Sequence, residues 1–110
     1  FVEDVTGNYR GVRVEGLQTI IEMCNQALDP LTSSQHLVSN QQVEINGDTA
    51  TCRCYLQAQH TLEGTEGGDN YIVAGRYEDE LIRTPDGWRI THRALIGDWT
   101  DGNPKVRGLS

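Results

Sequence analysis

The chain has 110 residues, of which 36% are hydrophobic and 23% are charged, so it fits one folded domain with one modest core and excludes a two-domain architecture. Sixteen acidic residues against nine basic ones give a net charge of −7. This balance argues against nucleic acid as a partner, because phosphate binding requires a basic face.

The N-terminal third of the chain predicts two short strands and one helix. The opening segment Phe1-Val2-Glu3-Asp4-Val5 has a strand-like composition. Over residues 15–27, apolar residues such as Leu17, Ile20 and Cys24 recur at spacings of three and four, and Asp29-Pro30 ends the pattern. This spacing indicates an amphipathic helix.

The rest of the chain predicts four long antiparallel strands. From residue 36 onward apolar and polar residues alternate, and Asn46-Gly47-Asp48 separates the first two runs, as in a tight hairpin. A glycine-rich loop follows, and residues 71–83 and 88–99 form a second hairpin around Thr84-Pro85-Asp86-Gly87. We expect the tail, residues 101–110, to be irregular.

Helix and strands are segregated along the chain, which indicates the α+β class. Residues 1–110 are therefore expected to form a single domain. A helix laid across a strongly curved antiparallel sheet encloses a cavity between the two, and such cavities bind small molecules.

The cysteines Cys24, Cys52 and Cys54 form no CxxC pair. We expect them to be reduced, small, buried side chains rather than metal ligands. The sequence also has no apolar run of membrane-spanning length and no signal-peptide pattern. We therefore expect a cytoplasmic protein with no membrane partner.

Two histidines are candidates for chemistry. Strand alternation places His60 on the face that carries Ala58 and Leu56, either lining a pocket or near solvent at a strand end. The orientation of His36 depends on the hairpin register. A two-residue Asn46-Gly47 turn places His36 opposite Gln57, whereas a three-residue loop, or a bulge between residues 36 and 40, brings it onto the face of His60.

Two imidazoles facing one cavity suit proton transfer, because their pKa near ~6.5 allows either to act as base or acid. They make a poor metal site, since zinc requires three or four donors at recognisable spacings. Tyr77 either packs in the sheet or donates a hydrogen bond to a substrate oxygen. Arg93 either forms a structural ion pair or orients a catalytic carboxylate.

An ordered series of segments resembles a known family. The series comprises His36-Leu37-Val38-Ser39-Asn40, Ile45-Asn46-Gly47-Asp48-Thr49-Ala50, Gly75-Arg76-Tyr77-Glu78-Asp79-Glu80-Leu81, Asp86-Gly87-Trp88-Arg89-Ile90 and Arg93. It resembles the SnoaL-like branch of the nuclear transport factor two-like superfamily, near scytalone dehydratase, hexachlorocyclohexane dehydrochlorinase and bile-acid dehydratase. The resemblance implies a cone-shaped, cystatin-like α+β barrel that forms homo-dimers or homo-trimers.

The resemblance also implies a function without metal or organic cofactor. Members eliminate water or halide, isomerise enones or cyclise polyketides. By resemblance His36 is the general base, His60 is the second pocket histidine, and Tyr77, Asn40 and Arg93 contact the substrate. In this family a partner aspartate and a tyrosine come from helices before the first strand, so we expect those N-terminal helices to be missing from this chain.

Three functions are consistent with the sequence. The first is a lyase or isomerase acting on a small cyclic or polyketide-like substrate. The second is a non-catalytic small-molecule-binding or assembly module of the same fold. The third is the small subunit of a ring-hydroxylating oxygenase.

Overall fold

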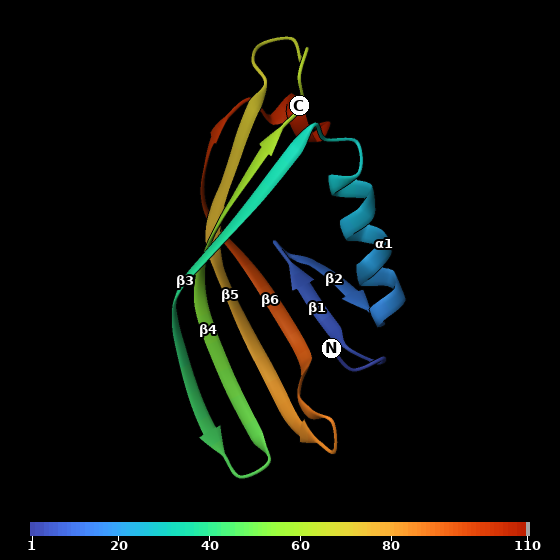
Figure 1. Cartoon of the computed structure of the whole chain (residues 1–110), viewed down its shortest axis with the longest axis vertical. Coiled ribbons are helices and arrows are strands. Elements are labelled where there is room, and N and C mark those ends of the chain that lie inside the picture. Colours follow the sequence, from blue (N-terminus) through green and yellow to red (C-terminus); the bar gives the residue numbers. More distant parts are fainter. Residues whose placement is uncertain (110) are drawn as a thin grey trace.

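The computed structural model describes residues 1–109 and has the predicted α+β architecture, a helix beside a curved, unclosed sheet (Figure 1). In chain order the elements are β1 (Thr6–Tyr9), β2 (Val12–Glu15), α1 (Leu17–Leu28), β3 (Ser33–Asn46), β4 (Thr49–Thr61), β5 (Asn70–Thr84), β6 (Gly87–Gly102) and the 3-10 helix η1 (Pro104–Arg107). A short strand pair before the helix, the helix and the four long strands are confirmed, although the pair comprises β1 and β2 and not the opening five residues.

The six strands form one sheet in the order β2-β1-β6-β5-β4-β3. Neighbouring strands are antiparallel except for β1 and β6, which run parallel, so the sheet is mixed rather than wholly antiparallel. In Figure 1, α1 lies along one side of the sheet, and the lower parts of β3 to β6 extend past the helix. Within the described residues, no helix has both the length and the apolar character needed to cross a bilayer.

The start of α1 explains why the opening residues form no strand, contrary to the expectation for Phe1-Val2-Glu3-Asp4-Val5. The carbonyls of Glu3 and Val5 accept hydrogen bonds from the backbone N–H groups of Leu17 and Gly16. No side chain caps this helix. The opening segment therefore supplies partners for N–H groups that would otherwise lack them at the start of the helix.

The β3–β4 hairpin answers the question of register. Asn46 pairs with Thr49, so the two-residue turn is Gly47-Asp48 and not the expected Asn46-Gly47, and the register shifts by one residue between Ser39 and Gln42. Within this bulge Asn40 has a positive φ of 54°. His36 consequently lies opposite Ala58, on the face that carries His60.

The tail is regular as far as Arg107, which corrects the expectation of an irregular 101–110 segment, of which Ser110 lies outside the described residues. β6 continues to Gly102, and Asn103 then caps η1 by accepting a hydrogen bond from the backbone N–H of Lys105. The Asn103 amide nitrogen also donates to the carbonyls of Glu66 and Gly68, both at 2.9 Å. The buried side chain of Val106 packs with Tyr71 and Val73 of β5, so η1 is anchored to the sheet.

Candidate active site

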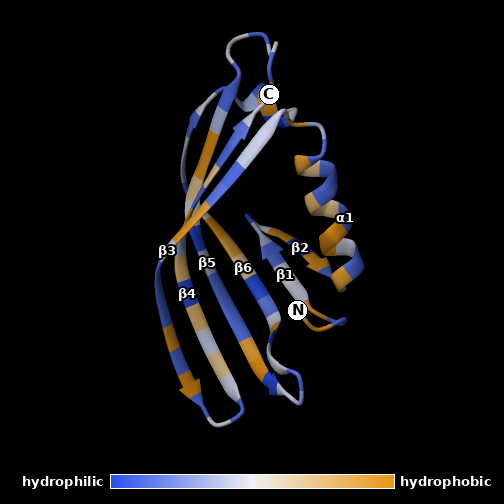
Figure 2. Ribbon diagram, viewed as in Figure 1, coloured by the Kyte–Doolittle hydropathy of each residue, from blue (hydrophilic) through white to orange (hydrophobic). Residues whose placement is uncertain are grey.

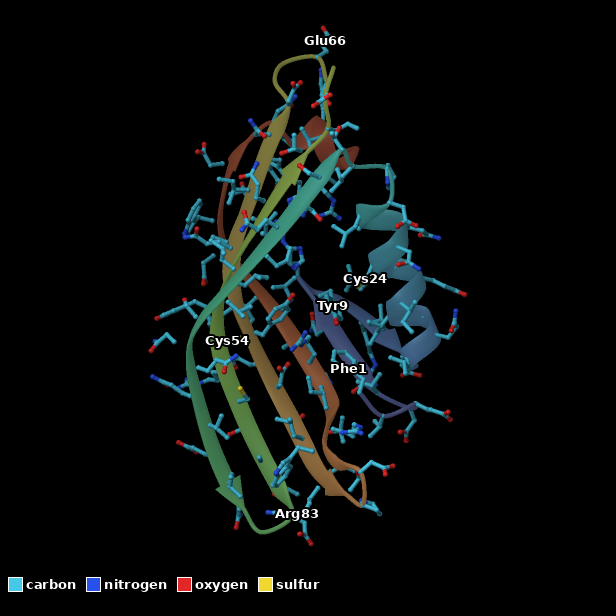
Figure 3. The ribbon with its side chains drawn as sticks, in the orientation of Figure 1. Phe1, Tyr9, Cys24, Cys54, Glu66 and Arg83 are labelled. Carbon is cyan, nitrogen blue, oxygen red and sulfur yellow. The ribbon has the colours of Figure 1, made fainter. Side chains whose placement is uncertain are left out.

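A cavity of about 270 Å³ lies between α1, the sheet and η1. Tyr9 and Cys24, labelled in Figure 3, are among its lining residues. Most of the wall is apolar, and the polar groups are few. The lining residues are Tyr9, Arg10, Val12, Met23, Cys24, Ala27, Leu28, His36, Leu56, Ala58, His60, Val73, Tyr77, Leu95 and Arg107.

The two histidines face each other in this cavity. Their ring centroids are 6.3 Å apart and the rings are close to perpendicular. His60 is only 2% exposed, whereas His36 lies on the exposed edge strand β3. The structure therefore brings together one buried imidazole and one that solvent and ligands can reach.

The hydrogen bonds of His60 define its tautomer. Nδ1 lies 3.1 Å from the Tyr71 carbonyl oxygen, to which it must donate, and Nε2 lies 3.5 Å from a guanidinium nitrogen of Arg107, from which it must accept. His60 is thus neutral with its proton on Nδ1. Burial lowers its pKa below 6.5, and the charges of Arg107 and His36 lower it further against the opposing effect of the Tyr71 hydrogen bond.

His36 is also favoured in its neutral form. Partial burial and the positive charge of Arg107 both lower the pKa of His36 below 6.5. A neutral imidazole can accept a proton, as a general base must. Within the described residues, however, no carboxylate lines the cavity beside it.

Two tyrosines add hydroxyl groups to the cavity. Burial raises the pKa of Tyr9 to about 12, although Arg93 opposes the shift. Burial raises the pKa of Tyr77 as well, again against Arg93. Both phenols therefore stay protonated at neutral pH and can donate hydrogen bonds to a bound oxygen.

Arg93 forms an ion pair, one of the two alternatives left open by the sequence. Its Nε and one terminal nitrogen each donate to a different oxygen of Asp79, both at 2.8 Å. The guanidinium carbon also lies 3.9 Å from the ring centroid of Tyr77, in a cation–π geometry. Arg93 does not line the histidine cavity. It contacts Tyr77, which does, so any effect of Arg93 on the cavity is exerted through Tyr77.

Asn40 lies apart from the two histidines. It borders a different hollow, shared with Gln42, Arg53, Arg76 and Asp98. Arg76 is held there by ion pairs to Asp98 and Glu78. Asn40 is therefore part of the β3 bulge and does not line the histidine cavity.

Tyr9, Arg10 and Arg107 line the cavity although sequence reasoning did not single them out. Arg107 stands in the tail that was expected to be irregular. The dipeptide Asn103-Pro104 was the available signal, since Asn is a good N-cap and Pro suits the first helical position. Tyr9 and Arg10 gave no comparable signal, because their position depends on the parallel pairing of β1 with β6.

The described residues contain no cluster of three or more His, Cys, Asp or Glu side chains arranged to hold a metal ion. The three cysteines are free thiols in the structure. The arrangement is thus an apolar pocket with two neutral imidazoles, two phenols and two guanidinium groups. These groups can form hydrogen bonds and exchange protons with a bound molecule.

The fold and the pocket define an α+β protein with a curved sheet and a mostly apolar cavity. The chain belongs to the SnoaL-like domain family, whose model matches residues 1–94. An uncharacterized protein of Mycobacterium tuberculosis is 30% identical over 96 residues, which cover 84% of this chain. The same alignment covers 64% of that protein, so this chain spans less than two thirds of its relative's length.

Solved structures share the fold. A candidate scytalone dehydratase from Novosphingobium aromaticivorans aligns with a TM-score of 0.81 and 20% identity, over 94% of this chain and 69% of its own. A hexachlorocyclohexane dehydrochlorinase aligns with a TM-score of 0.79 and 17% identity, over 94% of this chain and 70% of its own. Proteins with dehydratase and dehydrochlorinase names therefore have this architecture, and the likeness concerns the fold alone.

Proposed function

We propose that this protein is a cofactor-independent lyase or isomerase of the dehydratase type, acting on a small cyclic or polyketide-like substrate. The observation that carries the proposal is the meeting of His36 and His60 across one apolar cavity. The free cysteines support a reducing, cytoplasmic setting. The names of the structural neighbours support the reaction class.

In the proposed reaction, a ring nitrogen of neutral His36 removes a proton from the carbon next to a substrate carbonyl. The C–H electron pair moves into the forming enolate and then expels the hydroxyl group on the neighbouring carbon. That hydroxyl group leaves as water after it receives a proton. The step creates a carbon–carbon double bond between the two carbons. His36 stays protonated until it passes its proton on to Tyr77.

Tyr77 is the proposed proton donor to the departing oxygen, and His60, whose Nε2 accepts a hydrogen bond from Arg107, forms the polar wall of the cavity. The neighbouring Arg93 charge stabilises the phenolate that Tyr77 becomes when it gives up its proton. His36 then reprotonates Tyr77 directly or through water. Arg93 is therefore a positioning residue that acts on Tyr77.

The test is turnover of bicyclic β-hydroxy ketones, followed by the absorbance of the conjugated enone product. We expect His36→Ala to lower kcat by about 10²-fold or more, as is usual when a general base is removed. Gln35→Ala is the matched control, because Gln35 precedes His36 on the same exposed strand and points to the opposite face. A kcat of the His36→Ala variant equal to that of the wild-type protein would overturn the catalytic proposal.

Two other outcomes would identify the alternative functions. Tight binding of the same ketones without turnover by wild-type protein would indicate a non-catalytic binding module. Co-purification with a large iron-containing subunit would instead indicate the small subunit of a ring-hydroxylating oxygenase. Either result would replace the lyase proposal.

A further inference from the structure

Arg107 holds a fixed position at the edge of the histidine cavity. It is the last residue of η1, next to Val106, whose side chain is buried against β5. The Asn103 side chain ties the start of η1 to the loop between β4 and β5. The position of Arg107 is therefore built into the fold rather than left to a loose tail.

The charge of Arg107 has no acidic partner among the described residues. Its side chain contacts His60 Nε2 at 3.5 Å, a neutral acceptor that uses one of the five N–H donors of a guanidinium group. Four of the seven other arginines behave differently. Arg13, Arg76, Arg83 and Arg93 each form an ion pair with Asp or Glu.

The cavity around Arg107 is positive in an otherwise acidic chain. The lining residues include a second arginine, Arg10, and no Asp or Glu in the part of the chain that the structure describes. The overall net charge is −7. A partly buried cation without a counter-ion favours binding of an anion, because the anion forms charge-assisted hydrogen bonds with the unused donors.

We propose that Arg107 forms a carboxylate subsite of the histidine cavity, so that the ligand is an apolar, ring-sized molecule bearing one carboxylate. The apolar wall from α1, β4 and β5 accommodates the rings. Arg107 binds the carboxylate at the cavity edge, beside His60. This inference names the substrate class of the proposed enzyme. It rests on the proposed function in one respect: the ligand is a substrate only because the protein is proposed to be an enzyme.

The experiment compares two probes of equal shape, 2-naphthoate and its neutral amide 2-naphthamide, by calorimetric titration at pH 7. Wild-type protein should bind the carboxylate about tenfold more tightly than the amide or better. Arg107→Gln should abolish this preference while the affinity for the amide stays unchanged. Lys105→Gln, which removes the same charge from an exposed position of η1, should retain the wild-type preference.

Equal affinity of the wild-type protein for the two probes would overturn the subsite, as would an unchanged preference in Arg107→Gln. Failure of 2-naphthoate to bind at about 1 mM would overturn it as well. The turnover assay separates this inference from the proposed reaction, because the binding of 2-naphthoate requires no proton transfer. A carboxylate preference together with full turnover by His36→Ala would keep the subsite and discard the lyase mechanism.

Discussion

His60 makes the stability of the fold depend on pH. Because its pKa is lowered on folding, the unfolded chain binds more protons than the native state once the pH falls below about 6.5. Its contribution to stability is therefore complete above that pH and is lost as the pH falls through the lower native pKa. The lowered pKa of His36 acts in the same direction.

We predict that the free energy of unfolding falls more steeply between about pH 7 and pH 5 in wild-type protein than in a His60→Asn variant. Denaturant titrations at several pH values measure the two slopes. Val73→Ala is the control, since it weakens the same buried region without removing a titratable group. Equal slopes for wild type and His60→Asn would contradict the assignment of a lowered pKa to His60.

The Arg93–Asp79 pair gives a second prediction, about stability. Asp79 is 6% exposed and the Arg93 side chain 21%, so Arg93→Met would leave a buried carboxylate without its counter-ion. We expect the free energy of unfolding to fall by about 2–4 kcal/mol. The variant should also lower kcat, because Tyr77 loses the neighbouring charge.

The exposed pair Arg13–Glu15 supplies the comparison for Arg93. Both of its side chains are largely in water, so Arg13→Met should cost less than about 1 kcal/mol. Urea unfolding of the two variants measures both values. A cost for Arg93→Met as small as that for Arg13→Met would show that the buried pair is not needed for stability.

The bulge in β3 decides which way His36 points. Side chains alternate along a strand, so a shift of one residue turns each side chain to the opposite face. Asn40 makes the shift possible because it adopts a positive φ of 54°, which Asn and Gly tolerate better than other residues. A single backbone conformation thus brings the two histidines together.

We predict that Asn40→Val lowers the free energy of unfolding by about 1–2 kcal/mol, because a β-branched residue is strained at positive φ. Asn40→Gly should leave it nearly unchanged. Deleting Asn40 removes the extra residue of the bulge but leaves His36 opposite Ala58, because Ser39 still pairs with Tyr55 and Gln42 with Arg53, so a folded deletion variant should keep its turnover. A folded deletion variant whose turnover falls as far as that of His36→Ala would contradict this register.

These elements show how far the sequence could be interpreted. The periodicity around Ile20 and the Thr84-Pro85-Asp86-Gly87 turn are local signals, and both predicted the observed structure. The bulge at Asn40 could not be predicted, because the alternation of apolar and polar residues over 36–46 is compatible with either register. The cavity role of Arg107 depends on η1 packing against β5, a contact between residues distant in sequence.

The whole molecule is elongated for its size. It measures 51 × 28 × 23 Å, and its radius of gyration is 15.4 Å, whereas a compact chain of this length has about 13 Å. Much of the excess comes from the strands that extend past α1 in Figure 1. Apolar side chains on those strands thus lack a covering layer within the described part of the chain.

The edge strand β3 carries several exposed apolar side chains. All of its residues are exposed, and its unpaired backbone edge can accept another strand. Figure 2 shows hydrophobic positions near its hairpin end. The exposed apolar side chains of the strand are Leu37, Val38, Val43 and Ile45, the last of them 63% exposed.

We propose that a second copy of the chain covers this strand, giving the homo-dimer or homo-trimer that the family resemblance implies. Sedimentation equilibrium should show a mass that rises with concentration. The double variant Val43→Lys with Ile45→Lys should remain a monomer, because charges are costly to bury at an interface. Glu63→Lys changes the net charge by the same amount at an exposed position of the loop after β4, and should associate normally. A monomeric wild-type protein throughout the concentration range would contradict self-association and leave β3 open to water.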